Sequence, residues 1–171
     1  MSTFEQVWEE ITNLVRSGYF AQAEQQIDNL AEMDSDELET MWGLQSGQGN
    51  HNLSVLYNYI GLRYQDLAAF SVQQNQSKQV VRIMEDAERC HEKAWDMYDF
   101  SPEDVVYLPS NSPFNKNLLC TLAGLGRTKF LLRKFAESRK FLLLCTRITA
   151  TDEQAAGWQS EAALMLEAMS E

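Results

Sequence analysis

The sequence of 171 residues predicts an all-α fold in which antiparallel helical hairpins stack on one another. In residues 118–146, apolar and small side chains recur at helical spacing on both sides of a short break at residues 132–134. A similar arrangement recurs loosely in residues 8–32 and again within 53–98, and no region predicts strand better than helix. An isolated hairpin cannot bury its apolar face, so this recurrence predicts a stack of about seven to eight helices.

The hairpin at residues 118–146 has the most regular apolar faces. The residues on these faces are Leu118, Leu122, Leu125 and Gly126 in the first helix and Phe135, Ser138, Leu142 and Cys145 in the second. Gly126 and Ser138 are small, so the two helices are expected to approach closely where larger side chains would hold them apart.

The other two copies align on this hairpin. With Phe20 placed on Phe135, the next matching positions of the first copy are Ala23, Ile27 and Leu30. In the middle copy, Gly61 corresponds to Gly126. The second helix of that middle copy presents Ala87, His91 and Ala94.

Capping residues and breakers set the element boundaries near the N-terminus. Ser2 followed by Glu5 is a capping-box pattern that opens the first helix. A second helix is expected over residues 20–33, and Asp34 caps a short third helix. Glycines among polar residues then predict a mobile loop near 43–52.

Long helices and a proline-rich loop follow. One helix begins at about Leu53 and the next covers residues 78–98. All three prolines lie in a loop near 100–115, which is either a strap across its own helices or a gate on a binding groove. The last helix begins near residues 149–152, with Thr151 as its cap, and its polar outer side suits the end of a stack.

Length and composition fit one soluble globular domain over residues 1–171, with 44% hydrophobic and 23% charged residues. The N-terminus lacks the basic start and apolar run of a signal peptide. No apolar stretch reaches membrane-spanning length. A cytoplasmic protein with no membrane partner is therefore expected.

Charge is unevenly distributed in this chain of net charge −11. Residues 1–50 carry ten acids and a single base, Arg16. A basic cluster occupies the hairpin near the C-terminus and consists of Arg127, Lys129, Arg133, Lys134, Arg139, Lys140 and Arg147. These charges are either solvated helix faces that attract each other, or a basic strip for an acidic peptide and an acidic end for a basic partner. Nucleic-acid binding is not expected at this net charge.

The residue patterns that support catalysis or metal binding are incomplete. Glu88 and His91 have the E-x-x-H spacing of di-iron bundles, but the second such pair is missing. Neighbouring helix residues point apart, so Cys90 cannot pair with His91, whereas a pairing of His91 with Cys120 or Cys145 through the fold stays open without a local signature. The three cysteines, Cys90, Cys120 and Cys145, are expected to be buried free thiols. No phosphate loop, catalytic residue, metal site or cofactor is predicted.

The hairpin pattern resembles the tetratricopeptide repeat (TPR) family: a small residue after an aliphatic one in the first helix, then aromatic, small and bulky positions along the second. The resemblance implies a right-handed superhelix whose first helices line a concave groove. Its groove positions in this sequence are Asn58, Leu62, Gln65, Arg127, Phe130 and Leu131. The family often holds a peptide carboxylate with lysine, arginine and asparagine. Only Arg127 and Asn58 fit that role here, so an extended apolar–polar peptide is the favoured ligand.

The resemblance implies a protein-interaction module, an adaptor or chaperone that holds a segment of a partner protein. In size, acidity and repeat number the chain is similar to the small TPR-type chaperones of bacterial secretion systems. One alternative is an acidic inhibitor or regulator that occupies a basic site of its partner. Another is an enzyme centred on an accessible His91. Met165 and Met169 in the final helix serve either a core or the seam of a homodimer.

Overall fold

The computed structural model describes residues 2–105 and 107–170. Helices and their connections account for these residues, which confirms the all-α prediction. The helices are α1 (Phe4–Arg16), α2 (Phe20–Ala31), α3 (Ser35–Trp42), α4 (Gln48–Gln73), α5 (Ser77–Asp96), α6 (Pro102–Val105), α7 (Asn115–Leu131), α8 (Phe135–Cys145) and α9 (Glu153–Ser170). The element beyond the expected seven to eight is α6, a single turn inside the proline-rich loop.

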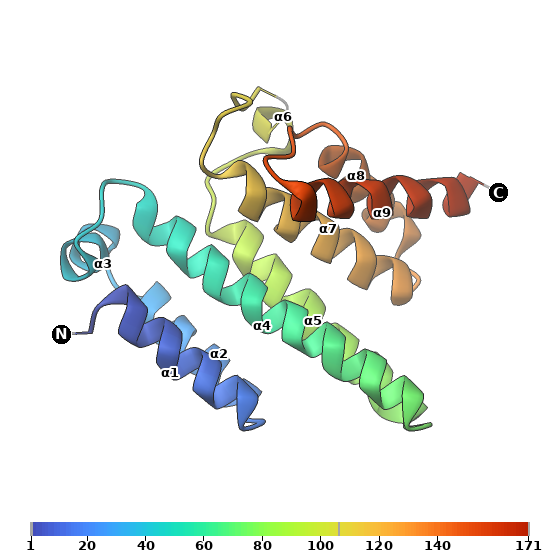
Figure 1. The fold of residues 1–171 in the computed structure, drawn as a ribbon, viewed down its shortest axis with the longest axis horizontal. Helices are drawn as coiled ribbons and strands as arrows, with labels where there is room; N and C mark the ends of the chain where they lie inside the picture. Colours follow the sequence, from blue (N-terminus) through green and yellow to red (C-terminus); the bar gives the residue numbers. More distant parts are fainter. Residues whose placement is uncertain (1, 106, 171) are drawn as a thin grey trace.

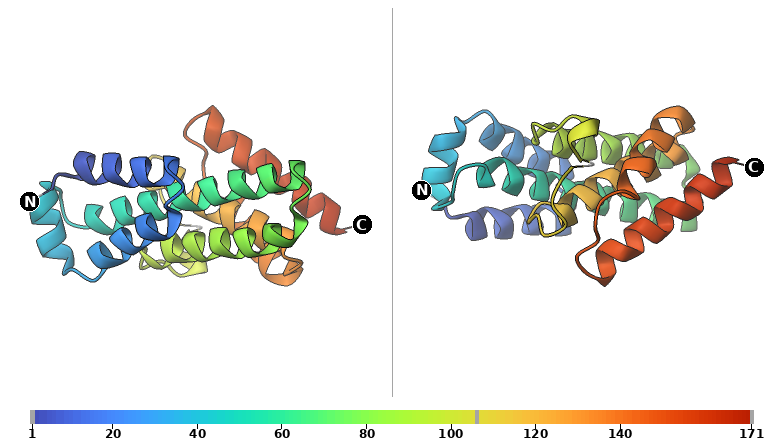
Figure 2. Two further views of the ribbon diagram at one scale, coloured as in Figure 1. Left: turned by 90° about the horizontal axis from the view of Figure 1, so that it is seen from below. Right: turned by 90° about the horizontal axis from the view of Figure 1, so that it is seen from above.

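Three antiparallel hairpins, α1–α2, α4–α5 and α7–α8, follow one another along the molecule, and α9 closes the series (Figure 1). Helix α4 contacts both helices of the hairpin before it, α7 contacts both α4 and α5, and α9 contacts both α7 and α8. Seen edge-on, α1 and α4 lie in one layer and α2 and α5 in the other (Figure 2).

The same turn closes all three hairpins. Gly18, Asn75 and Arg133 adopt left-handed backbone conformations, with φ of 85°, 57° and 62°. In each case the next residue donates its N–H to a carbonyl five residues back, which ends the first helix in the Schellman manner. The three donor and acceptor pairs are Tyr19 to Leu14, Gln76 to Ser71 and Lys134 to Lys129.

These turns correct the alignment of the middle copy. Counting back from Asn75 and from Arg133, the counterpart of Gly126 is Ala68, whereas Gly61 lies seven residues earlier. Seven residues are about two helical turns, so the shifted alignment still selects the same face of α4. The close approach predicted within the third hairpin is confirmed, because Ser138 Oγ donates to the carbonyl of Gly126 at 2.7 Å.

Two apolar cores lie on either side of the α4–α5 hairpin. The N-terminal core joins α1, α2 and α3 to α4 and α5 through residues such as Ile11, Ile27 and Leu56. The C-terminal core joins α7, α8 and α9 through Leu119, Leu142 and other apolar residues. Between them, at the contact of α4 and α5 with α7, lies a layer of buried polar side chains.

Several predicted boundaries differ from the structure. Thr3, not Ser2, caps α1, and its capping box is completed by Gln6. The loop expected near 43–52 is shorter, because α4 begins at Gln48, where Glu39 Oε1 accepts the N–H groups of Gly47 and Gly49. The final helix is capped by Asp152, whose Oδ1 accepts the N–H of Ala155.

The loop near 100–115 packs on the C-terminal core through Val105 and Leu108, as a strap would. Its Tyr107 is 83% exposed, and Val106 lies outside the described residues.

Asp34 caps α3 as predicted, since its side chain accepts the N–H of Asp36 at 2.9 Å.

Candidate binding groove and its polar floor

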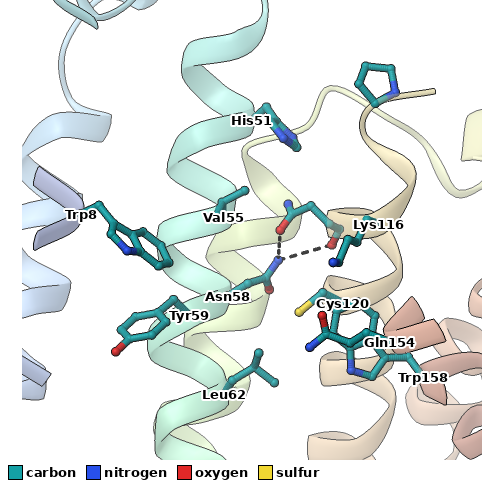
Figure 3. Close-up of a pocket in the computed structure, with 12 residues that line it drawn as sticks. Trp8, His51, Val55, Asn58, Tyr59, Leu62, Lys116, Cys120, Gln154 and Trp158 are labelled. Atoms are coloured by element: carbon teal, nitrogen blue, oxygen red, sulfur yellow. Dashed lines mark hydrogen bonds between the residues drawn. The ribbon is translucent and has the colours of Figure 1, made fainter. Parts of the chain in front are cut away.

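A groove of about 440 Å³ runs between α1, α4, α7 and α9, and we call it the aromatic groove. Figure 3 shows Trp8 of α1 on one side and Trp158 of α9 on the other, with side chains of α4 and α7 between them. Its lining residues are Trp8, His51, Val55, Asn58, Tyr59, Leu62, Pro113, Lys116, Asn117, Cys120, Gln154 and Trp158.

The walls of the aromatic groove are mainly apolar. The rings of Trp8 and Tyr59 lie 5.0 Å apart at their centroids, which holds both side chains in place. Phe4 and Val55 extend the apolar surface past Trp8 along α1 and α4. The single charged group in the lining, Lys116, forms an ion pair with Asp152 at 2.7 Å. The groove is therefore close to electrically neutral.

Two asparagines form the floor of the aromatic groove. Asn58 Nδ2 donates to Asn117 Oδ1 at 2.9 Å and to Thr121 Oγ1 at 2.7 Å. Asn117 Nδ2 donates to Ser54 Oγ at 2.8 Å and to the hydroxyl of Tyr98 at 2.7 Å. Side chains of α4 and α7, together with Tyr98 just after α5, thus satisfy the floor, as buried polar groups require.

His91 lies directly behind this floor and has no exposed surface. Its imidazole is held between Gly61 of α4 and Gly124 of α7. A Cβ atom added at Gly61 would lie 2.7 Å from the ring, and one added at Gly124 would lie 2.6 Å from it. Both glycines are therefore explained by the space that the histidine occupies where three helices meet.

Hydrogen bonding fixes the orientation of each polar group around His91. Arg127 can only donate, so its guanidinium faces Gln65 Oε1, at 2.7 Å. Gln65 Nε2 then faces His91 Nε2 at 2.8 Å, which makes that ring nitrogen the acceptor. The proton is thereby assigned to His91 Nδ1, which donates to Asn58 Oδ1 at 2.8 Å.

The imidazole of His91 is neutral in this setting. Burial, with a further contribution from the charge of Arg127, lowers the pKa of His91 to about 3. The enzyme hypothesis required an accessible His91 beside an acid or a thiol. Instead, both ring nitrogens contact side-chain amides in the interior.

The structure separates the six residues predicted to line one groove. Asn58 and Leu62 line the aromatic groove. Gln65 is buried in the network around His91, and Arg127 pairs with Glu161 through two hydrogen bonds. At the end of α7, the ring of Phe130 packs 5.6 Å from that of Phe135, and the neighbouring Leu131 is 53% exposed.

Sequence reasoning did not select Trp8, Tyr59 or Trp158 as groove residues. In the sequence, Trp8 and Trp158 fall at helical spacing among other apolar residues of their helices, and such a stripe includes both core-facing and groove-facing positions. Both tryptophans are partly buried and pack against the edge of their core. An apolar stripe that is wider than the core-facing side of its helix is the sequence signal for such edge positions.

The basic cluster is partly neutralised inside the chain. Lys129 is buried, and its Nζ lies 3.1 Å from Glu88, 2.9 Å from Glu92 and 2.7 Å from Glu137. Burial alone would lower the pKa of Lys129, but these three carboxylates outweigh it and raise the pKa. Glu88 also pairs with Lys134 at 2.7 Å. For Lys129 and Lys134, the interpretation as helix faces that attract each other therefore describes the charge pattern.

The cysteines are buried and free, as expected. Burial raises the pKa of Cys120 to about 12, so its thiol is protonated although it lines the aromatic groove. Within residues 2–105 and 107–170, no group of three or more His, Cys, Asp or Glu side chains is placed to hold a metal ion. None of the helices in this described part combines the length and apolarity needed to cross a membrane.

Comparison of the chain with protein-family models, curated proteins and solved structures gave no match.

Proposed function

We propose that this chain is a cytoplasmic protein-interaction module, an adaptor or chaperone that holds a segment of a partner protein in the aromatic groove. We further propose that its hairpins form a TPR-like right-handed superhelix. The repeated Schellman turn and the packing of each hairpin's first helix on both helices of the preceding hairpin support this arrangement. The proposal includes the resemblance to the small TPR-type chaperones of bacterial secretion systems.

The apolar groove between α1, α4, α7 and α9 is the observation that carries the function. Its aromatic and aliphatic side chains come mainly from α1, α4 and α9, so no single helix completes the surface. Partly buried tryptophan and tyrosine side chains are frequent anchors of protein interfaces because they contribute large contact areas at small entropic cost. A partner segment would add burial to side chains that the fold already holds in place.

The electrostatics of the aromatic groove favour an extended, uncharged segment. Lys116 is already paired with Asp152, and the amide groups of the floor are already hydrogen-bonded within the chain. Arg127, the expected partner of a peptide carboxylate, is occupied by Glu161 and Gln65. Affinity would therefore come mainly from apolar side chains of the partner, which matches an apolar–polar peptide.

The test is selection of binders from a random peptide display library on the immobilised chain, followed by titration calorimetry. We expect enrichment of neutral peptides rich in apolar residues. Leu62→Glu places a charge in the groove and should raise their Kd about tenfold or more. The matched control, Leu131→Glu, makes the same change at an exposed position outside the groove and should leave the Kd unchanged. Equal binding to both variants would reject the aromatic groove as the site.

A further inference from the structure

A second concave surface lies between α1, α2 and α3, and we call it the methionine groove. It consists of two adjoining hollows of about 450 and 310 Å³ that share Met33 and Met41. The residues that line it are Ser2, Val7, Glu10, Gln26, Asn29, Leu30, Met33, Asp36, Glu37, Thr40 and Met41.

The centre of the methionine groove is apolar and adaptable. Leu30, Met33 and Met41 are each partly buried against the N-terminal core. Methionine is unbranched and polarisable, so these two side chains can adjust to apolar groups of different shapes. Surfaces rich in methionine are used in this way to bind varied amphipathic segments.

The rim of the methionine groove carries negative charge that the chain does not neutralise. Glu10, Asp36 and Glu37 are all exposed. Within residues 2–105 and 107–170, no cation lies within 4.0 Å of any of these three carboxylates. The single base of the first fifty residues, Arg16, is at the far end of α1.

Other acids of the first fifty residues are neutralised by ion pairs, in contrast to the three acids of the rim. Glu24 pairs with Arg89 and Lys93, each at 2.7 Å, and Asp28 pairs with Lys93 at 2.9 Å. These pairs join α2 to α5. The rim acids differ, because among the described residues they pair with no cation and they line an apolar hollow.

We infer that the methionine groove docks a basic amphipathic segment of a partner protein. Apolar side chains of that segment would enter the hollow over Met33 and Met41, while its lysine or arginine side chains would meet the acidic rim. Opposite charge would speed the encounter and select against acidic segments. A second copy of this chain is a poorer occupant, because each molecule carries a net charge of −11. This inference does not depend on what fills the aromatic groove.

The experiment uses the full chain labelled at its methionine methyl groups and a synthetic helical peptide of leucine and lysine. A second peptide keeps the leucines and replaces lysine with glutamate. We expect the lysine peptide to shift the NMR signals of Met33 and Met41 and to leave those of Met165 and Met169 in α9 unchanged. The glutamate peptide should shift none of them.

Matched variants separate a built site from general attraction to an acidic protein. Glu10→Gln/Asp36→Asn/Glu37→Gln should raise the Kd of the lysine peptide about tenfold at physiological salt. The control, Glu103→Gln/Glu153→Gln/Glu167→Gln, removes the same charge from exposed positions elsewhere and should change it less than about twofold. Met33→Gln/Met41→Gln retains the charge and should also weaken binding. Leu62→Glu should bind the lysine peptide normally, which distinguishes this site from the aromatic groove.

Three results would overturn the inference. The first is equal weakening by the rim variant and its control, since that would mean non-specific attraction. The second is a shift of Met165 or Met169 without one at Met33 or Met41. The third is a concentration-dependent shift of Met33 and Met41 without peptide, accompanied by a dimer in light scattering, which would assign the surface to a second copy. Thermal unfolding by circular dichroism verifies that each variant is folded.

Discussion

The two grooves of this molecule differ in what their polar groups do. In the aromatic groove, the asparagines of the floor are hydrogen-bonded to side chains of three helices and connect to the buried His91. In the methionine groove, the carboxylates of the rim form no ion pair within the described residues. Polar residues of the first kind maintain the fold, whereas those of the second kind are available to a partner. Substitutions in the two regions should therefore differ in their effect on stability.

The largest effect is expected where α7 meets the histidine behind the aromatic groove. In Gly124→Ala, the new Cβ would lie 2.6 Å from a ring that two amides hold in place, so neighbouring helices must separate. We expect the free energy of unfolding to fall by about 3 kcal/mol, measured by urea denaturation. Gly157→Ala in α9 is the matched control, because its added Cβ would meet no described atom within 4 Å beyond its chain neighbours and the backbone of its own helix.

The control variant should gain about 0.5–1 kcal/mol, the usual benefit of replacing a helical glycine with alanine. Opposite signs for the two Gly→Ala substitutions would support the packing of three helices around His91. If Gly124→Ala were as stable as the wild type, the described contact of α7 with His91 would be wrong.

The features predicted from sequence are those set by residues close together in the chain. Helix positions follow from local periodicity, and the contact of Gly126 with Ser138 follows from spacing within one hairpin. The contact of Gly124 with His91 joins different hairpins, so no local pattern reveals it. The sequence alone places Gly124 only inside the first helix of the hairpin at residues 118–146.

Candidate binding residues were harder to predict, because the position of a residue on a helix face does not specify how deeply its side chain is buried. Asn58 and Gln65 lie on the predicted face of α4, yet both are buried, since α7 packs against that face. The methionine groove escaped prediction for a similar reason. Met33 lies between α2 and α3, and its neighbour Met41 depends on how α3 docks. The sequence indicated the methionine groove only through the excess of acids in the first fifty residues.

An intermediate effect is expected for Glu24, an acid that the fold does use. Burial alone would raise the pKa of Glu24, but hydrogen bonds and charges from Arg89 and Lys93 together lower it to about 2. Its ion pairs therefore stabilise the native state fully above about pH 4.5, and this contribution is lost as the pH falls toward 2. Because Arg89 and Lys93 are partly exposed, we expect Glu24→Gln to cost about 1–2 kcal/mol at pH 7.

The measurement is urea unfolding of the wild type and Glu24→Gln at several pH values between 7 and 2. The difference in unfolding free energy between them should be constant down to about pH 5 and then shrink toward zero as the carboxylate of the wild type takes up its proton. Other groups titrate in the same range, His91 among them, but they are common to both proteins and cancel in the difference. A difference that grew on acidification would contradict the assigned role of Glu24.

The smallest effect on stability is expected at the rim of the methionine groove. Glu10→Gln/Asp36→Asn/Glu37→Gln removes three carboxylates that make no ion pair in the described residues, so mutual repulsion is relieved. The loss of Asp36 and Glu37 from the first turn of α3 opposes this gain, because acids there complement the helix dipole. We expect a net change within about 0.5 kcal/mol at pH 7. A loss as large as that for Glu24→Gln would mean that the rim acids maintain the fold, and the distinction between the two grooves would fail.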